Sequence, residues 1–316
     1  MTTTAHELLS SALRAHIETV GKTIHRVLST AQGRRGAGAS GRASGAAKDP
    51  SSEADDAEEA VHDFRVGLRR LRTALRPAKV IYGKKRLRVI GEGLKRYGDV
   101  TSALRDEEVL RQTLAKLPLD EGARSAVTSW LAQRVKQERV RRGDVVRLLR
   151  SGAVPAQVGE DGVPEVPALE VCLARLEKRL DRPKRTEMTA EELGRQAIAE
   201  ALRDIEAMGQ VEAADVSGMH TLRIRFKRLR YTAELFTPAF GERGEKTAKA
   251  AARLQSKLGD LHDLDQALVR MARARGLPPA AREAVLQALQ RARTEMAEKC
   301  VKELSAWRGA EAQRAL

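Results

Sequence analysis

Aromatic residues are scarce in this chain of 316 residues, at 3% of the composition. So few rings argue against an aromatic-rich β-sandwich or barrel, and against a surface that stacks single-stranded bases. Long apolar runs are missing as well, since no stretch approaches the 18 or more apolar residues that span a bilayer. The N-terminal sequence has neither a basic start nor an apolar segment. We therefore expect no secretory signal and a cytoplasmic location.

Cysteine is nearly absent, with only Cys172 and Cys300 in the chain. Two cysteines cannot build a disulfide framework. Both lie within helical apolar stripes, which predicts two buried thiols.

Positive charge is in clear excess. Lysine and arginine number 58 against 43 acidic residues, for a formal charge of +15, and 42 of the cations are arginine. An excess of this size indicates a polyanionic partner, and guanidinium groups bind phosphate oxygens in a bidentate manner. Genomic composition bias could produce the same arginine content, so charge alone does not identify the partner.

Nearly every patterned stretch has the period of an α-helix, which predicts an all-α protein. A break is expected near Gly98, and Thr189 with Glu192 forms a capping box that opens a helix. The predicted helices cover about 4–30, 58–82, 84–117, 121–150, 168–181, 190–209, 217–237, 243–274 and 280–308.

Two segments interrupt these helices. Residues 31–57 are rich in Gly, Ala, Ser and charge, which predicts a disordered insertion. Residues 151–167 hold three prolines and three glycines, which is typical of a boundary. We therefore predict one four-helix bundle over 1–152 and a second over 166–312.

An internal repeat relates the two halves. Residues 61–76, VHDFRVGLRRLRTALR, match residues 219–234, MHTLRIRFKRLRYTAE, and a weaker match pairs LRDEEVL (104–110) with LHDLDQAL (261–268). Two copies in the same order predict duplicated four-helix bundles related by a pseudo-twofold axis.

The repeated helix carries two parallel rows of side chains. Val61, Phe64, Leu68, Leu71 and Leu75 follow the 3-4 spacing of a core stripe. A cationic row follows the same spacing one residue further on, so it lies about 100° around the helix. We call this set the first basic row; it consists of His62, Arg65, Arg69, Arg72 and Arg76. The second basic row, predicted as the opposing wall of a cleft, consists of His220, Arg223, Lys227 and Arg230.

Rows of like charge cost free energy, because cations three or four residues apart on a helix repel one another. A multivalent anion would neutralise both rows, and this predicts an anion site. The alternative is that these side chains pair with carboxylates on neighbouring helices, as in many bundles. The two histidines are the tunable members, with binding expected to strengthen as they protonate near pH 6.5.

The two motif helices resemble the first signature of the CHAD family, the conserved-histidine α-helical domain. The second signature of that family resembles LGDLHDLDQAL (258–268), with a weaker counterpart in YGDVTSALRDEEVL (97–110). The resemblance extends from about residue 5 to 310, apart from 31–57. It implies two pseudo-symmetric four-helix bundles around a basic cavity, binding of inorganic polyphosphate, and association with polyphosphate granules. By motif position it also implies phosphate contacts from the two basic rows.

Other readings stay open at this stage. His62-Asp63 and His262-Asp263 spell the pair used by metal-dependent phosphohydrolases acting on polyphosphate or nucleotides, but no further ligand appears at a recognisable spacing. Asp260, Asp263 and Asp265 suit a divalent cation bridging to phosphate; alternatively Asp260 caps a helix and Asp263 pairs with a motif arginine.

The basic segments 84–96 and 134–150 suggest non-specific nucleic-acid binding, although charge runs on bundle helices are more often solvated faces. No P-loop is present. We therefore expect a non-catalytic polyphosphate-binding protein with no cofactor and no metal site.

Overall fold

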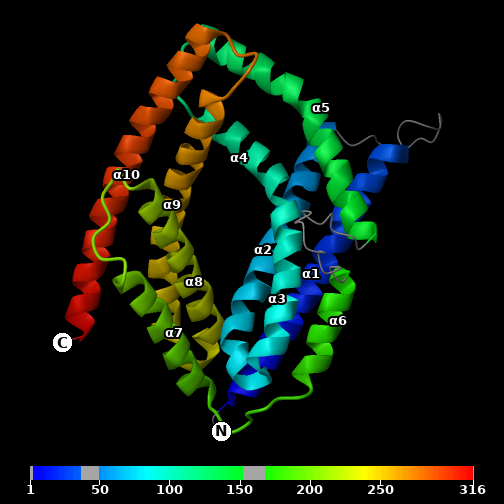
Figure 1. The fold of residues 1–316 in the computed structure, drawn as a ribbon, viewed down its shortest axis with the longest axis vertical. Coiled ribbons are helices and arrows are strands. Elements are labelled where there is room, and N and C mark those ends of the chain that lie inside the picture. The colour runs from blue at the N-terminus through cyan, green and yellow to red at the C-terminus, as the bar shows by residue number, and fades with distance from the viewer. Residues whose placement is uncertain (1–2, 37–49, 152–167, 316) are drawn as a thin grey trace, which may run out of the picture. The chain divides into compact units, whose positions relative to one another are not determined.

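The chain is all-helical in a computed structural model that describes residues 3–36, 50–151 and 168–315 (Figure 1). The all-α prediction is confirmed. Besides helices, the described ranges contain one isolated antiparallel bridge, between Thr4 and Thr189. The helices are α1 (Ala5–Gly36), α2 (Pro50–Tyr82), α3 (Lys84–Val100), α4 (Ser102–Ala115), α5 (Glu121–Ser151), α6 (Leu169–Leu180), α7 (Ala190–Glu206), α8 (Val216–Phe240), α9 (Glu242–Ala272) and α10 (Pro279–Ala315).

The segment predicted as a disordered insertion is partly helical. α1 continues to Gly36 and α2 begins at Pro50, so both ends of 31–57 belong to helices, while residues 37–49 lie outside the described residues. The sequence SSEADDAEEA explains the correction, because Ala and Glu are strong helix formers and acidic residues favour a helix N-terminus. Of the predicted boundary 151–167, residues 152–167 also lie outside the described part of the chain.

The chain divides into two compact units. Unit 1 comprises Met1–Glu107 and Lys136–Leu193, and unit 2 comprises Glu108–Val135 and Gly194–Leu316. These units differ from the division at 152/166 predicted from sequence, because the tip of the α4–α5 hairpin, Glu108–Val135, joins the second unit and α6 joins the first. Figure 1 shows α1, α2, α3 and α6 of unit 1 running alongside one another.

Apolar packing explains why the tip of the α4–α5 hairpin belongs to unit 2. Leu110, Leu114 and Trp130 share one buried cluster with Met271 and Val285. The Trp130 indole also donates a hydrogen bond to the Arg275 carbonyl, at 2.9 Å. Trp130 therefore anchors the core of unit 2.

Local signals set the helix ends. The predicted capping box is present: the Thr189 N–H donates to Glu192 at 2.9 Å, and the Glu192 N–H donates to the Thr189 hydroxyl at 3.1 Å. Gly83 joins α2 to α3 with a φ of 96°, and Gly241 joins α8 to α9 with a φ of 56°. Both conformations favour glycine, so each basic helix turns directly into the next one.

The described ranges contain no helix long and apolar enough to cross a membrane. Cys172 and Cys300 are buried thiols, as predicted. Burial raises the pKa of Cys300 to about 11 and also raises that of Cys172.

Candidate anion-binding site

The core stripe of α2 is buried along its whole length. Its five residues are all 6% exposed or less. In α8 the matching residues Met219, Leu222, Phe226 and Leu229 are at most 2% exposed. The burial of these residues defines the side of each helix that faces the core. Each basic row lies beside that buried stripe, one residue further along the helix, as the helical period predicts.

The first basic row is exposed at its two ends and partly buried at its centre. His62 and Arg76, at its two ends, are exposed, whereas Arg65, Arg69 and Arg72 are partly buried. The three central guanidinium groups are therefore partly removed from water on the surface of unit 1.

Arg65 reaches into the break between α3 and α4. Its Nη1 donates to the Gly98 carbonyl at 2.8 Å, and it lies 3.0 Å from the Thr101 hydroxyl and 3.2 Å from the Ser102 hydroxyl. The predicted break near Gly98 thus provides acceptors for a basic-row side chain. Burial, followed by repulsion from Arg69, lowers the pKa of Arg65 to about 10.

Arg69 and Arg72 form the centre of the row. Among the described residues, neither guanidinium makes a hydrogen bond or an ion pair. Burial lowers the pKa of Arg72, with a further lowering from Arg69 and Arg76 that Asp99 partly opposes. These two side chains combine partial burial with mutual repulsion, which is the arrangement that an anion would stabilise.

The row continues one step beyond the predicted set. Lys79 follows Arg76 at the same spacing, and burial together with Arg76, Lys84 and Arg88 lowers its pKa. Lys79 was not among the predicted site residues, although the 3-4 periodicity of the sequence contains this signal.

The second basic row includes a pair of histidines. His220 Nδ1 lies 3.1 Å from His262 Nδ1, and the ring centroids are 4.5 Å apart. Burial lowers the pKa of His220, and it lowers that of His262 to about 4, with Arg223 as the next cause in both cases. His262 therefore belongs to this cluster, although the sequence analysis left it out. For His220, protonation in the unliganded protein therefore needs a pH below the expected 6.5, while the same expectation for His62 stays a prediction.

Two arginines of α8 already have carboxylate partners. Arg230 Nε lies 2.7 Å from Glu234, and its Nη1 lies 3.4 Å from Gln255. Arg228, which is not a member of the second basic row, pairs with Glu200 at 2.6 Å and with Asp204. The ion-pair alternative therefore holds at Arg230, which is less available to a ligand than Arg69 or Arg72.

The acidic residues of α9 have structural surroundings. Asp260 lies inside α9, so the expectation that it caps a helix is wrong, and burial raises its pKa. Asp265 Oδ1 lies 3.0 Å from Arg293 Nε, with both side chains about nine-tenths buried. Within the described ranges, no group of three or more His, Cys, Asp or Glu side chains is arranged to hold a metal ion.

The CHAD domain model matches residues 37–272 of this chain, about three-quarters of its length. The chain belongs to the CHAD domain family. Polyphosphate binding is known for this family. No curated protein sequence matches the chain.

Two solved structures have the same fold as this CHAD chain. The crystal structure of the CHAD domain from the plant Ricinus communis is 21% identical, with a TM-score of 0.61, over 93% of this chain and 86% of that one. PptA from Streptomyces chartreusis is 13% identical, with a TM-score of 0.65, over 97% of this chain and all of that one. At these identities the likeness establishes the fold.

Corresponding positions of the two CHAD motifs have similar surroundings within their own units. Arg65 donates to the Gly98 carbonyl. Arg223 lies close to Gly259, since a Cβ added to Gly259 would be 4.0 Å from the Arg223 Nε. Gly83 and Gly241 follow the two motif helices. The duplication itself and the central cavity stay predictions, and these matched positions are what a duplication leads us to expect.

Proposed function

We propose that this CHAD domain binds inorganic polyphosphate through its two basic rows and catalyses no reaction. The observation that carries the proposal is the centre of the first row, where Arg69 and Arg72 are partly buried among other cations. Negative charge on a bound ligand would stabilise a site of this kind.

The spacing of the first row suits a linear polyanion. Side chains three or four residues apart on a helix are neighbours, and the 11 residue steps from Arg65 to Arg76 span about 17 Å of helix. A polyphosphate chain carries a negative charge at each phosphate, so several successive phosphates would contact successive arginines. Guanidinium groups add bidentate geometry to this charge pairing.

The lowered pKa values give the energetic reason. Burial and neighbouring cations lower the pKa of Arg65, Arg72 and Lys79 because the charged forms are disfavoured in the free protein. Bound phosphates reverse the sign of the local potential and favour those charged forms. Binding thus relieves a repulsion present in the fold, and its free energy should fall steeply with added salt.

The second basic row is proposed to contact the same polymer through Arg223 and Lys227, with a smaller part for Arg230 because of Glu234. A single cleft shared by both rows, a cytoplasmic location and association with polyphosphate granules belong to the same proposal.

The test is a calorimetric titration of defined-length polyphosphate into the protein at two salt concentrations, with an equal charge of single-stranded DNA as the comparison. We expect tight, salt-sensitive binding that prefers polyphosphate. Equal binding of both polymers would indicate a general basic surface instead. Incubation with polyphosphate and Mg²⁺, followed by an assay for released phosphate, tests the non-catalytic part, which sustained release would overturn.

A further inference from the structure

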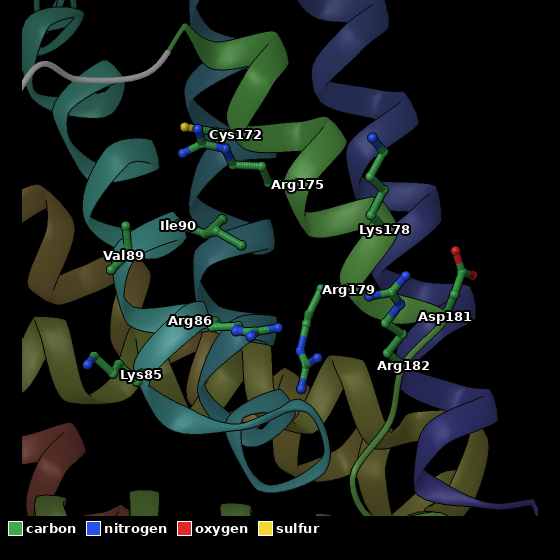
Figure 2. A pocket seen from close by; sticks show the side chains of 10 residues that line it. All are labelled: Lys85, Arg86, Val89, Ile90, Cys172, Arg175, Lys178, Arg179, Asp181 and Arg182. Atoms are coloured by element: carbon green, nitrogen blue, oxygen red, sulfur yellow. The ribbon is translucent and has the colours of Figure 1, made fainter.

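A second concentration of positive charge lies within unit 1, on a different pair of helices. A pocket of about 970 Å³ opens between α3 and α6. Figure 2 shows Arg86 extending from α3 toward α6, where Arg179 lies, and Arg175 beside Cys172 on the same side of α6. The residues that line it are Lys85, Arg86, Val89, Ile90, Cys172, Arg175, Lys178, Arg179, Asp181 and Arg182.

The charge of this pocket is strongly unbalanced. Six of its ten lining residues are cations and one is an acid. That acid, Asp181, is already paired with Arg14 of α1 at 2.6 Å. None of the six cations makes an ion pair with a carboxylate of the described residues. The pocket therefore holds a surplus of positive charge that the described part of unit 1 leaves uncompensated.

One of these cations is fixed in place as part of the fold. Arg179 is buried, and its Nε donates to the Tyr82 carbonyl at the end of α2, at 2.9 Å. The other five are exposed. The site thus combines one buried guanidinium, held by a backbone carbonyl, with five exposed cationic side chains, and all six can form charge-assisted hydrogen bonds to an anion.

The positions of the α3 cations are unfavourable without a ligand. Lys84, Lys85 and Arg86 form the first turn of α3, and no side chain caps that end of the helix. Cations are disfavoured near a helix N-terminus, where the backbone dipole is positive. A bound anion in the neighbouring pocket would offset this cost.

The remaining lining residues are apolar. Val89 and Ile90 of α3 and Cys172 of α6 line the pocket as well, and Val89 is a large hydrophobic side chain that is 51% exposed. A site for phosphate alone needs no apolar lining. The volume of this pocket falls in the range of small-molecule pockets. The chemistry points to a ligand with a multivalent phosphate group and an apolar organic part.

We propose that the α3–α6 pocket binds an organic molecule carrying a di- or triphosphate group, the class to which nucleoside triphosphates belong. The phosphates contact Arg86, Arg175 and Arg179, and the organic part covers Val89. This site is separate from the basic rows, so its existence does not depend on the polyphosphate proposal.

The test is a calorimetric titration of the full chain with three probes: ATP, inorganic triphosphate and adenosine. We expect ATP to bind most tightly, inorganic triphosphate more weakly, and adenosine far more weakly than either. Arg86→Ala and Arg175→Ala should each weaken ATP binding by about ten-fold, since each removes a charge-assisted hydrogen bond. Both side chains are exposed, so neither change should affect folding.

Arg88→Ala is the matched control. Arg88 lies two residues from Arg86 on the same helix, is exposed, and pairs with Glu92 at 3.7 Å rather than lining the pocket. The Arg88→Ala variant should bind ATP with the affinity of the wild type. Val89→Ser should weaken ATP binding and leave inorganic triphosphate binding unchanged.

Three results would overturn the proposal. One is ATP binding that does not change in Arg86→Ala and Arg175→Ala. Another is ATP binding that falls equally in Arg88→Ala, which would show a non-specific charge effect. The third is inorganic triphosphate that binds as tightly as ATP, which would show that the organic part of the ligand contributes nothing to its affinity. Polyphosphate binding that depends on Arg69 and Arg72 is a separate outcome, so either proposal can fail alone.

Discussion

The Arg65 guanidinium donates a hydrogen bond of 2.8 Å to the carbonyl of Gly98, in the last turn of α3 beside its junction with α4. The same Nη1 also lies 3.0 Å from the Thr101 hydroxyl. A side chain of the basic row is therefore part of the helix junction. This separates the roles within the row: Arg65 contributes to folding, whereas Arg69 and Arg72 are available to a ligand.

Arg65→Ala should destabilise the protein. The change leaves the Gly98 carbonyl without its guanidinium donor, and hydrogen bonds to charged groups contribute roughly 1.5–3 kcal/mol. We expect the free energy of unfolding, measured by urea titration, to fall by about 2 kcal/mol. Arg69→Ala serves as the comparison. Equal stability of Arg65→Ala and the wild type would show that the junction does not need this contact.

Neutralising the centre of the row should have the opposite effect on stability. Arg69→Gln with Arg72→Gln removes repulsion between like charges on one helix, worth about 0.2–0.5 kcal/mol per pair. The midpoint of thermal unfolding should rise slightly without polyphosphate. The additional rise that polyphosphate gives the wild type should shrink in the variant, because stabilisation follows affinity. A lower midpoint without ligand would contradict the repulsion argument.

The histidine pair predicts a pH dependence of stability. The pKa of His262 is lowered from 6.5 to about 4, so between these values the unfolded chain binds a proton that the folded chain does not. Stability should therefore fall as the pH falls from 6.5 toward 4. His262→Gln should flatten this part of the urea-unfolding profile, and His25→Gln, at an exposed position of α1, should not. An unchanged profile in His262→Gln would contradict the assignment.

Polyphosphate should tighten its binding over the same pH range. Phosphates near His220 and His262 favour the protonated rings, so binding takes up protons below pH 6.5. Calorimetric titrations at pH 7.5 and 5.5 should show higher affinity at the lower pH in the wild type and a smaller difference in His262→Gln. Equal pH dependence in both would place the titrating group elsewhere.

The buried pair of Asp265 and Arg293 predicts a large loss of stability. Arg293→Met leaves the Asp265 carboxylate without its partner in a region about nine-tenths buried. Breaking a buried pair by removing one partner costs about 3–5 kcal/mol. Asp265→Leu combined with Arg293→Met should recover much of this loss. A loss below 1 kcal/mol in Arg293→Met would show that the pair is not effectively buried.

Features with a local period were predictable from the sequence. The buried stripe from Val61 to Leu75 and the basic row beside it follow from the helical period alone, as does the capping box at Thr189. Lys79 and the Arg230–Glu234 pair carry the same kind of signal, at spacings of three and four residues, and were not recognised.

Contacts between distant segments were not predictable. The acceptor of Arg65 lies 33 residues away and the partner of His220 lies 42 residues away, so no spacing rule joins them. The α3–α6 pocket likewise needs the tertiary fold to bring Arg86 near Arg175. The tip of the α4–α5 hairpin belongs to unit 2 because its apolar face packs there, which the order of helices along the chain does not indicate.

One further repeat could have been found from spacing. Thr4 accepts from the Glu7 N–H at 3.2 Å, as Thr189 does from Glu192, so α1 and α7 open on the same box. Thr4 precedes His62 by 58 residues, and Thr189 precedes His220 by 31. The difference equals the 27 residues of 31–57, as expected for an insertion in the first copy.

The central claim is that the first basic row binds polyphosphate, and a matched titration tests it most directly. Arg69→Gln with Arg72→Gln is compared with Lys246→Ala and Lys249→Ala, which removes two charges from exposed positions of α9. The account predicts polyphosphate affinity at least about ten-fold weaker in the first variant, with near wild-type affinity in the second. Equal affinity in both variants would contradict it.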